Sequence, residues 1–223
     1  ALQKRLMLLV SEYAEKYGDR NINIANCANV SFRDIKIVGS YSQKDKFGYA
    51  ISMYNVWNVK CHHVVGNAKW GVFGNNNVSD SYLKDSDLNR YDCHCYGRNL
   101  TAVNCRFHDD SFCISSFYGT IKYERCTFVN SRPVHTRADY NTYVPFELEL
   151  KNCSITMNNG LNSIIYMGTI DYGENTRPEL RSKSWPDVKI NGLKIIVENG
   201  MKDISLYSYL GKVQPDIIIE GLS

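Results

Sequence analysis

The pattern of apolar and polar residues changes once along the chain, near Asn21. Before that point the apolar residues recur at the spacing of one helix face, at Leu2, Leu6, Leu9, Val10 and Tyr13. Gly18 is a natural end for such a helix. After Asn21 the apolar residues alternate with polar ones at period two, which is typical of half-buried strands. The pattern predicts a helical cap or connector over residues 1–20 and an all-β domain over residues 21–223.

A short motif recurs in the β region and consists of an apolar residue, any residue, Asn or Asp, then Cys, Leu or Ile. Its central positions form a ladder: Ile35, Cys61, Ser81, Cys105, Cys126, Cys153, Leu193 and Leu222. A minimal step of about 20 residues with irregular additions indicates stacked coils with loops inserted on one side. Because the leucine-rich-repeat signature is missing, we expect a right-handed parallel β-helix, a solenoid of about eight coils.

Asparagine and cysteine fit this expectation in different ways. Asn tolerates left-handed backbone conformations, so we expect coil corners at Asn29, Asn77, Asn99 and Asn152. The eight cysteines lie mostly in strand-like apolar contexts and are predicted to be free, buried thiols from a reducing compartment. Neither Cys61-His62-His63 nor Cys93-His94-Cys95 has the Cys-x2-Cys spacing of a zinc site. We therefore predict no metal ligands and no cofactor.

The overall charge excludes some partners. There are 26 Lys and Arg residues against 23 Asp and Glu, for a formal net charge of +3. This balance is far from the strongly basic composition of nucleic-acid-binding domains, so we expect no nucleic-acid partner. No apolar run has the length of a membrane span. A chain that begins at Ala1 without Met is expected to be processed or to be part of a longer protein.

Two short runs carry the candidate chemistry. In Leu88-Asn-Arg-Tyr-Asp-Cys-His94, strand alternation predicts one charged, outward face and one inward face. The outward residues are Arg90, Asp92 and His94, and the inward residues are Tyr91, Cys93 and Cys95. The second run, Val134-His-Thr-Arg-Ala-Asp139, places outward His135, Arg137 and Asp139. Two coils would separate the runs by about 10 Å.

This spacing allows several chemistries. Asp92 and Asp139 are candidates for the acid, base or nucleophile of a glycoside hydrolase. A lyase would instead use His94 or His135 as the base. Arg90 and Arg137 are expected to bind anionic groups of the substrate. The alternative interpretation is a solvated sheet face on which these charges only form ion pairs.

Long insertions follow the second run and contain aromatic residues among charges. Tyr140, Tyr143 and Trp185 are candidates for stacking against sugar rings. Trp57 and Trp70 are instead expected to pack within the coils.

Four segments resemble a known family: Lys69-Trp-Gly-Val-Phe-Gly74, Leu88 to His94, His135-Thr-Arg-Ala-Asp-Tyr140, and Leu148-Glu-Leu-Lys-Asn-Cys153. They are similar to the pectate-lyase-like β-helix family found in phage tailspikes, in preneck appendage proteins and in related bacterial proteins. The likeness extends from about Tyr49 to Leu222. The chain departs from the family where Asn141-Thr-Tyr-Val144 replaces Gly-Ser-Thr-Trp, which leaves Tyr143 as a stand-in for the tryptophan.

The resemblance implies a homotrimeric or other homo-oligomeric virion spike that is assembled in the host cytoplasm, with a secreted or cell-surface bacterial protein as the alternative. It also implies that the protein binds and depolymerises a bacterial surface polymer such as capsule, lipopolysaccharide or teichoic acid. A non-catalytic receptor-binding or structural segment is the second hypothesis. Fold likeness cannot decide between them, because one fold can carry many activities.

Overall fold

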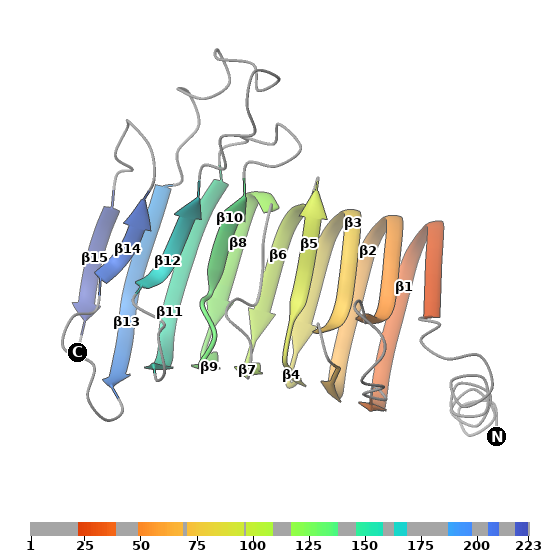
Figure 1. Ribbon diagram of the computed structural model, residues 1–223, viewed down its shortest axis with the longest axis horizontal. Helices are drawn as coiled ribbons and strands as arrows, with labels where there is room; N and C mark the ends of the chain where they lie inside the picture. Colours follow the sequence, from red (N-terminus) through yellow and green to blue (C-terminus); the bar gives the residue numbers. More distant parts are fainter. Residues whose placement is uncertain are drawn as a thin grey trace, which may run out of the picture.

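The structure is a computed structural model that describes residues 22–38, 49–68, 71–95, 97–108, 117–137, 146–157, 163–168, 187–197, 205–209 and 217–222. The helical segment expected over residues 1–20 lies outside these ranges. Within them the regular elements are strands (Figure 1). They are β1 (Ile22–Val38), β2 (Tyr49–Asn67), β3 (Gly71–Lys84), β4 (Asp87–Leu88), β5 (Tyr91–Cys95), β6 (Gly97–Val103), β7 (Arg106–His108), β8 (Phe117–Glu124), β9 (Thr127–Val129), β10 (Val134–Arg137), β11 (Phe146–Met157), β12 (Ser163–Gly168), β13 (Asp187–Val197), β14 (Ser205–Tyr209) and β15 (Ile217–Leu222).

The long strands bend at residues with a left-handed backbone. These corner residues are mostly Asn and Asp, the types that tolerate positive φ best. The four predicted corners are confirmed, with φ of 61° at Asn29, 52° at Asn77, 50° at Asn99 and 52° at Asn152. Corners also fall on less usual residue types, with φ of 52° at both His63 and Arg125.

All strand pairs in the described part of the chain are parallel. Twelve strands belong to one sheet, and β10, β12 and β14 form a second sheet of three strands. β2 pairs with β1 along its length, and β11 pairs with β13. Because β2 and β11 bend, each also pairs with two further strands in succession: β2 with β3 and β4, and β11 with β8 and β9.

These double pairings correct the predicted fold. The branch β3-β6-β8 and the branch β4-β7-β9 both run from β2 to β11, so the pairing closes a ring of eight strands. β1, β5, β13 and β15 are added to this ring. The prediction of an open right-handed β-helix solenoid was therefore wrong, and the sheet closes into an all-parallel barrel with extra strands. A repeat period gives the chain distance between paired strands and does not reveal that two branches rejoin.

The core is a column of apolar side chains from successive strands. Its largest fully buried members are aromatic and include Tyr91, Tyr123, Phe73, Phe107 and Phe128. Cys61, Cys93, Cys105, Cys126 and Cys153 are buried and free, and Cys27 is half-buried and free. The prediction of buried free thiols is confirmed for these five, while Cys95 and Cys113 have no described side chain.

The ladder drawn from the motif is only partly in register. From Cys105 onward the predicted neighbours are adjacent: the pairing aligns Cys105 with Cys126, and Cys153 with Leu193. Earlier in the chain, Ile35 pairs with Val64 and not with Cys61, which pairs with Phe32 and Leu83. The alignment failed there because His63, and not Asn or Asp, occupies the corner before Val64.

Candidate functional site

The first predicted half of the site is buried. Asp92 is 0% exposed, as are its neighbours Tyr91 and Cys93, so both faces of β5 are covered. The Tyr49 hydroxyl donates a hydrogen bond to Oδ2 of Asp92. Nη1 of Arg90 lies 3.7 Å from the same oxygen and donates to the Tyr49 hydroxyl over 3.3 Å. The expectation that Arg90 and Asp92 face solvent was therefore wrong.

The cause is a contact between strands that the local pattern does not contain. Gly74 of β3 pairs with Asp92 of β5, and a Cβ at Gly74 would overlap the Tyr49 ring. The missing side chain thus leaves the space through which Tyr49 of β2 reaches Asp92. Burial and the nearby Asp92 charge together raise the pKa of Tyr49 well above its usual value, so its hydroxyl stays protonated and can donate.

The positions of the other predicted residues are described only in part. The pairing of β3 with β5 shifts after Cys93, so that His94 is an extra residue opposite no partner. His135 and Arg137 lie in β10, which belongs to the smaller sheet, while β5 belongs to the larger one. The side chains of His94, His135 and Arg137 are not described, and Asp139, Tyr140, Tyr143 and Trp185 lie outside the described ranges.

A different group of polar residues comes together along one line of corners, which we call the corner row: Asp34, His63, Asp85, Asn104 and Arg125. Nδ1 of His63 lies 3.0 Å from Oδ1 of Asp34, and its Nε2 lies 3.7 Å from Oδ2 of Asp85. Asn104 donates to Oδ1 of Asp85 over 3.0 Å, and Nε of Arg125 donates to Oδ1 of Asn104 over 2.9 Å. The Asn104 hydrogen bond is the main cause that lowers the pKa of Asp85, helped by Lys84 and the two histidines.

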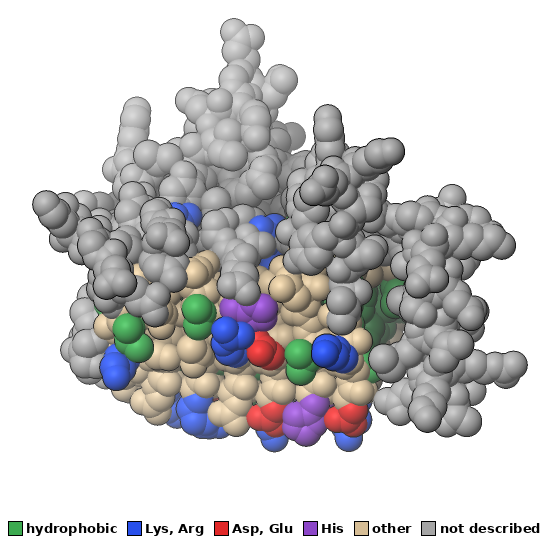
Figure 2. Space-filling view, turned by 60° about the horizontal axis from the view of Figure 1, so that its bottom comes forward, with side chains coloured by type: hydrophobic (Ala, Val, Ile, Leu, Met, Phe, Trp, Pro, Cys, Tyr) green, Lys and Arg blue, Asp and Glu red, His purple; other side chains and the backbone are tan. Residues whose placement is uncertain are grey.

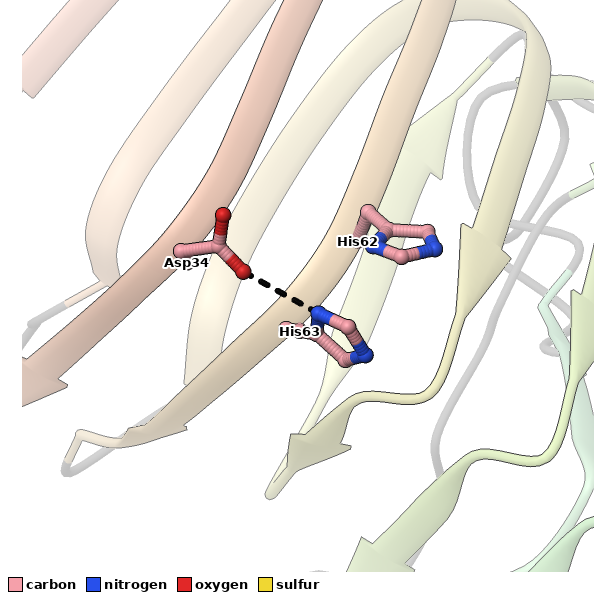
Figure 3. A group of neighbouring side chains, drawn as sticks. All are labelled: Asp34, His62 and His63. Carbon is pink, nitrogen blue, oxygen red and sulfur yellow. Dashed lines mark hydrogen bonds and ion pairs between the residues drawn. The ribbon is translucent and has the colours of Figure 1, made fainter.

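His62 lies in β2 directly before His63, and its side chain lies beside those of His63 and Asp34 (Figure 3). Because the backbone turns at His63, the two successive imidazoles lie close together, with ring centroids 4.2 Å apart. Nε2 of His62 lies 3.7 Å from Oδ2 of Asp85. Its Nδ1 is buried and has no hydrogen-bond partner. Cys61, the neighbour that suggested a zinc motif, is fully buried in the core.

Beyond Asp85 the surface forms a shallow polar depression of about 360 Å³, lined by Asp85, Ser86, Asp87, Asn104, Cys105, Arg106, Arg125 and Thr127. Nη1 of Arg106 lies 3.0 Å from Oδ1 of Asp87, and Nε2 of His108 lies 3.2 Å from the same oxygen. In Figure 2, acidic, basic and histidine side chains gather along the lower edge of the face in view. The depression therefore offers hydrogen-bond donors and acceptors of several kinds within one small area.

Large aromatic side chains are exposed on β2 and β3. Trp57 is 52% exposed, Tyr54 45% and Tyr82 39%. The strand neighbours of Trp57 are the small residues Ala28 and Ser79, which cannot cover its ring. The expectation that Trp57 packs within the structure was therefore wrong, while Trp70 lies outside the described residues.

Comparison with known proteins gave no match among family models, curated proteins or solved structures. The expected membership of the pectate-lyase-like β-helix family was wrong, because the closed pairing conflicts with a solenoid, and the tailspike role it implied has no support. The part of the chain that the structure describes contains no helix long and apolar enough to cross a membrane.

Sequence reasoning missed Asp34, His62, His63 and Asp85 as a group. Two signals were available. One was the adjacent pair His62-His63, which was set aside because Cys61-His62-His63 lacks zinc-motif spacing. The other was the corner position: an Asp, a His and an Asp occupy the place where Asn otherwise recurs. The distance between Asp34 and Asp85 along the chain gives no hint that one histidine lies between them.

Proposed function

We propose that the protein is a non-catalytic module that binds a hydroxyl-rich carbohydrate polymer through the polar depression. The observation that carries this proposal is the lining of the depression. It combines carboxylates of Asp85 and Asp87, guanidinium groups of Arg106 and Arg125, the Asn104 amide and the Thr127 hydroxyl. Carboxylates accept, guanidinium groups donate, and amides and hydroxyls do both, so adjacent hydroxyls of a sugar can each be paired.

The charge of the depression favours a neutral polymer over a polyanion. Two acidic residues balance two arginines in the lining. Arg106 already pairs with Asp87 over 3.0 Å, and Arg90, expected to bind an anionic substrate, is held by Asp92 and Tyr49. A strongly anionic chain would have to compete with these internal carboxylates for each guanidinium group.

A binding role is also favoured by the state of Asp92. A glycoside hydrolase needs two carboxyl groups that face the substrate from opposite sides of the scissile bond. Asp92 is fully buried and bonded to Tyr49, so it offers no carboxylate to a ligand at the surface. The proposal therefore assigns Asp92 a structural role.

The test is to measure binding of the protein to a panel of neutral and anionic bacterial polysaccharides and teichoic acids. Arg106→Gln and Asp87→Asn are expected to weaken binding of a neutral polymer about tenfold, which is the loss of roughly one charge-assisted hydrogen bond. Lys122→Gln is the matched control. Lys122 and its partner Glu149 are exposed to a similar degree as Arg106 and Asp87, but they lie outside the depression.

The outcomes separate the alternatives clearly. Unchanged binding in Arg106→Gln and Asp87→Asn, or equal loss in the Lys122→Gln control, would remove the depression from the binding surface. Release of reducing ends from any polymer would contradict the non-catalytic role. Tighter binding of teichoic acid than of any neutral polymer would contradict the charge argument.

A further inference from the structure

The geometry of Asp34, His62 and His63 points to a second site, and we propose that these three residues bind a divalent transition-metal ion such as Zn²⁺. This proposal is independent of polymer binding. One ligand atom from each of the three residues lies within 4.8 Å of the others (Figure 3). Two imidazoles and a carboxylate are a ligand set of the kind that binds zinc and other first-row divalent metals.

The unpartnered ring nitrogen of His62 is the second observation. Nδ1 of His62 is buried and lacks a hydrogen bond, although the ring as a whole is partly exposed. A buried nitrogen without a partner is energetically unfavourable, because water is lost and nothing replaces it. A bound metal ion supplies the missing partner.

Asp85 completes the arrangement from the other side. Its Oδ2 lies 3.7 Å from Nε2 of both His62 and His63. Metal-binding histidines usually donate their second ring N–H to a carboxylate, which orients the ring and increases its basicity as a ligand. Asp85 stands where such an outer carboxylate would be, and the Asn104 amide in turn orients Asp85 over 3.0 Å.

The backbone holds the three ligands and the outer carboxylate of Asp85 on three neighbouring chain segments. Asp34 lies in β1, the two histidines lie in β2, and Asp85 is the corner residue directly after β3. Parallel pairing of these strands sets the spacing between the ligands. The left-handed backbone at His63, with φ of 52°, breaks the strand alternation, and the rings of His62 and His63 lie side by side with centroids 4.2 Å apart.

The competing explanation is a simple ion-pair row in which His63 bridges Asp34 and Asp85 without a metal. The experiment is a Co²⁺ titration of chelator-treated protein, followed by visible absorption and by calorimetry, with Zn²⁺ added to displace Co²⁺. We expect one equivalent to bind with the spectrum of nitrogen and oxygen ligands. A sulfur-to-metal charge-transfer band would place the ion on a cysteine and overturn the proposal.

Variants test the ligands one by one. Asp34→Asn and His63→Asn keep a residue type that tolerates positive φ, so they remove the ligand with little backbone strain. His62→Gln removes the second imidazole. Each is expected to weaken Co²⁺ binding at least about tenfold, and Asp85→Asn by a smaller factor.

His108→Gln is the matched control. His108 lies 3.2 Å from Asp87, so it is also a histidine beside a carboxylate, but it belongs to no metal-ligand group among the described residues. Its loss should leave Co²⁺ affinity unchanged. Absence of binding by the parent protein, or equal affinity in parent, Asp34→Asn and His62→Gln, would overturn the site.

Discussion

The Tyr49 hydroxyl donates a hydrogen bond to the buried carboxylate of Asp92, although β3 lies between their strands β2 and β5 in the sheet. The hydrogen bond joins the first residue of β2 to the second residue of β5. It removes from solvent the aspartate that the sequence pattern indicates as a catalytic candidate. Removal of this hydrogen bond should therefore change the stability of the fold, and the first two predictions concern the Tyr49 side chain that makes it.

Tyr49→Phe should destabilise the fold by about 1–3 kcal/mol, because Asp92 stays buried and loses a donor that no water replaces. The measurement is urea unfolding followed by circular dichroism. Tyr82→Phe is the control, since Tyr82 is 39% exposed. Equal stability of Tyr49→Phe and the parent protein would show that the hydrogen bond is unimportant.

Gly74→Ala should destabilise the fold by about 1–3 kcal/mol or more, because the new methyl group overlaps the Tyr49 ring. The same substitution in a Tyr49→Ala background should cost much less, since the ring is then gone. A double-mutant cycle measured by urea unfolding gives this coupling. Additive effects of the two substitutions would contradict the contact.

The corner residue Asn55 has φ of 53° and two amide hydrogen bonds, to Asn26 over 2.8 Å and from Asn77 over 2.7 Å. Asn55→Gly loses these hydrogen bonds, and Asn55→Ala loses them and also forces a methyl group into the left-handed region. We therefore expect the Ala variant to be less stable than the Gly variant by about 1 kcal/mol. The order should reverse at Thr101, a strand residue of β6 without positive φ, where Gly is the poorer choice.

Thiol reactivity should follow burial. Burial raises the pKa of Cys61, and hydrogen bonding with Cys105 and Cys153 is the main cause that raises the pKa of Cys126. Both thiols should therefore resist iodoacetamide in the native protein, whereas the half-buried Cys27 should react before either of them. Peptide mapping by mass spectrometry reads each residue separately. Modification of Cys61 before Cys27 would show that the core opens more readily than the edge strand β1.

Part of the fold could be predicted because it depends on local rules. Period-two alternation indicated strands, Asn residues marked corners, and cysteines in apolar runs indicated buried free thiols. The predicted ladder matches the strand register from Cys105 to Leu222, where Asn, Arg or Gly precedes each ladder residue. It does not match near Cys61, because the chain bends at His63 there.

The candidate site was harder to predict, because alternation along one strand says nothing about what covers it. Arg90 and Asp92 do lie together, as the sequence indicated. Asp92 is bonded to Tyr49, a residue 43 positions earlier in the chain, and is not exposed. Tyr49 reaches Asp92 because Gly74 has no side chain in the way.

The sequence by itself determined that the chain forms strands with asparagine corners and a core containing free cysteines, because these follow from side-chain size and backbone preference at each position. Only the tertiary structure decided that the sheet closes into a ring, that Asp92 is buried, and that Asp34, His62, His63 and Asp85 meet. The physical reason is that each of these depends on which strands become neighbours. Strand pairing brings together residues about 20 to 40 positions apart, and no local pattern encodes which of them will share a face.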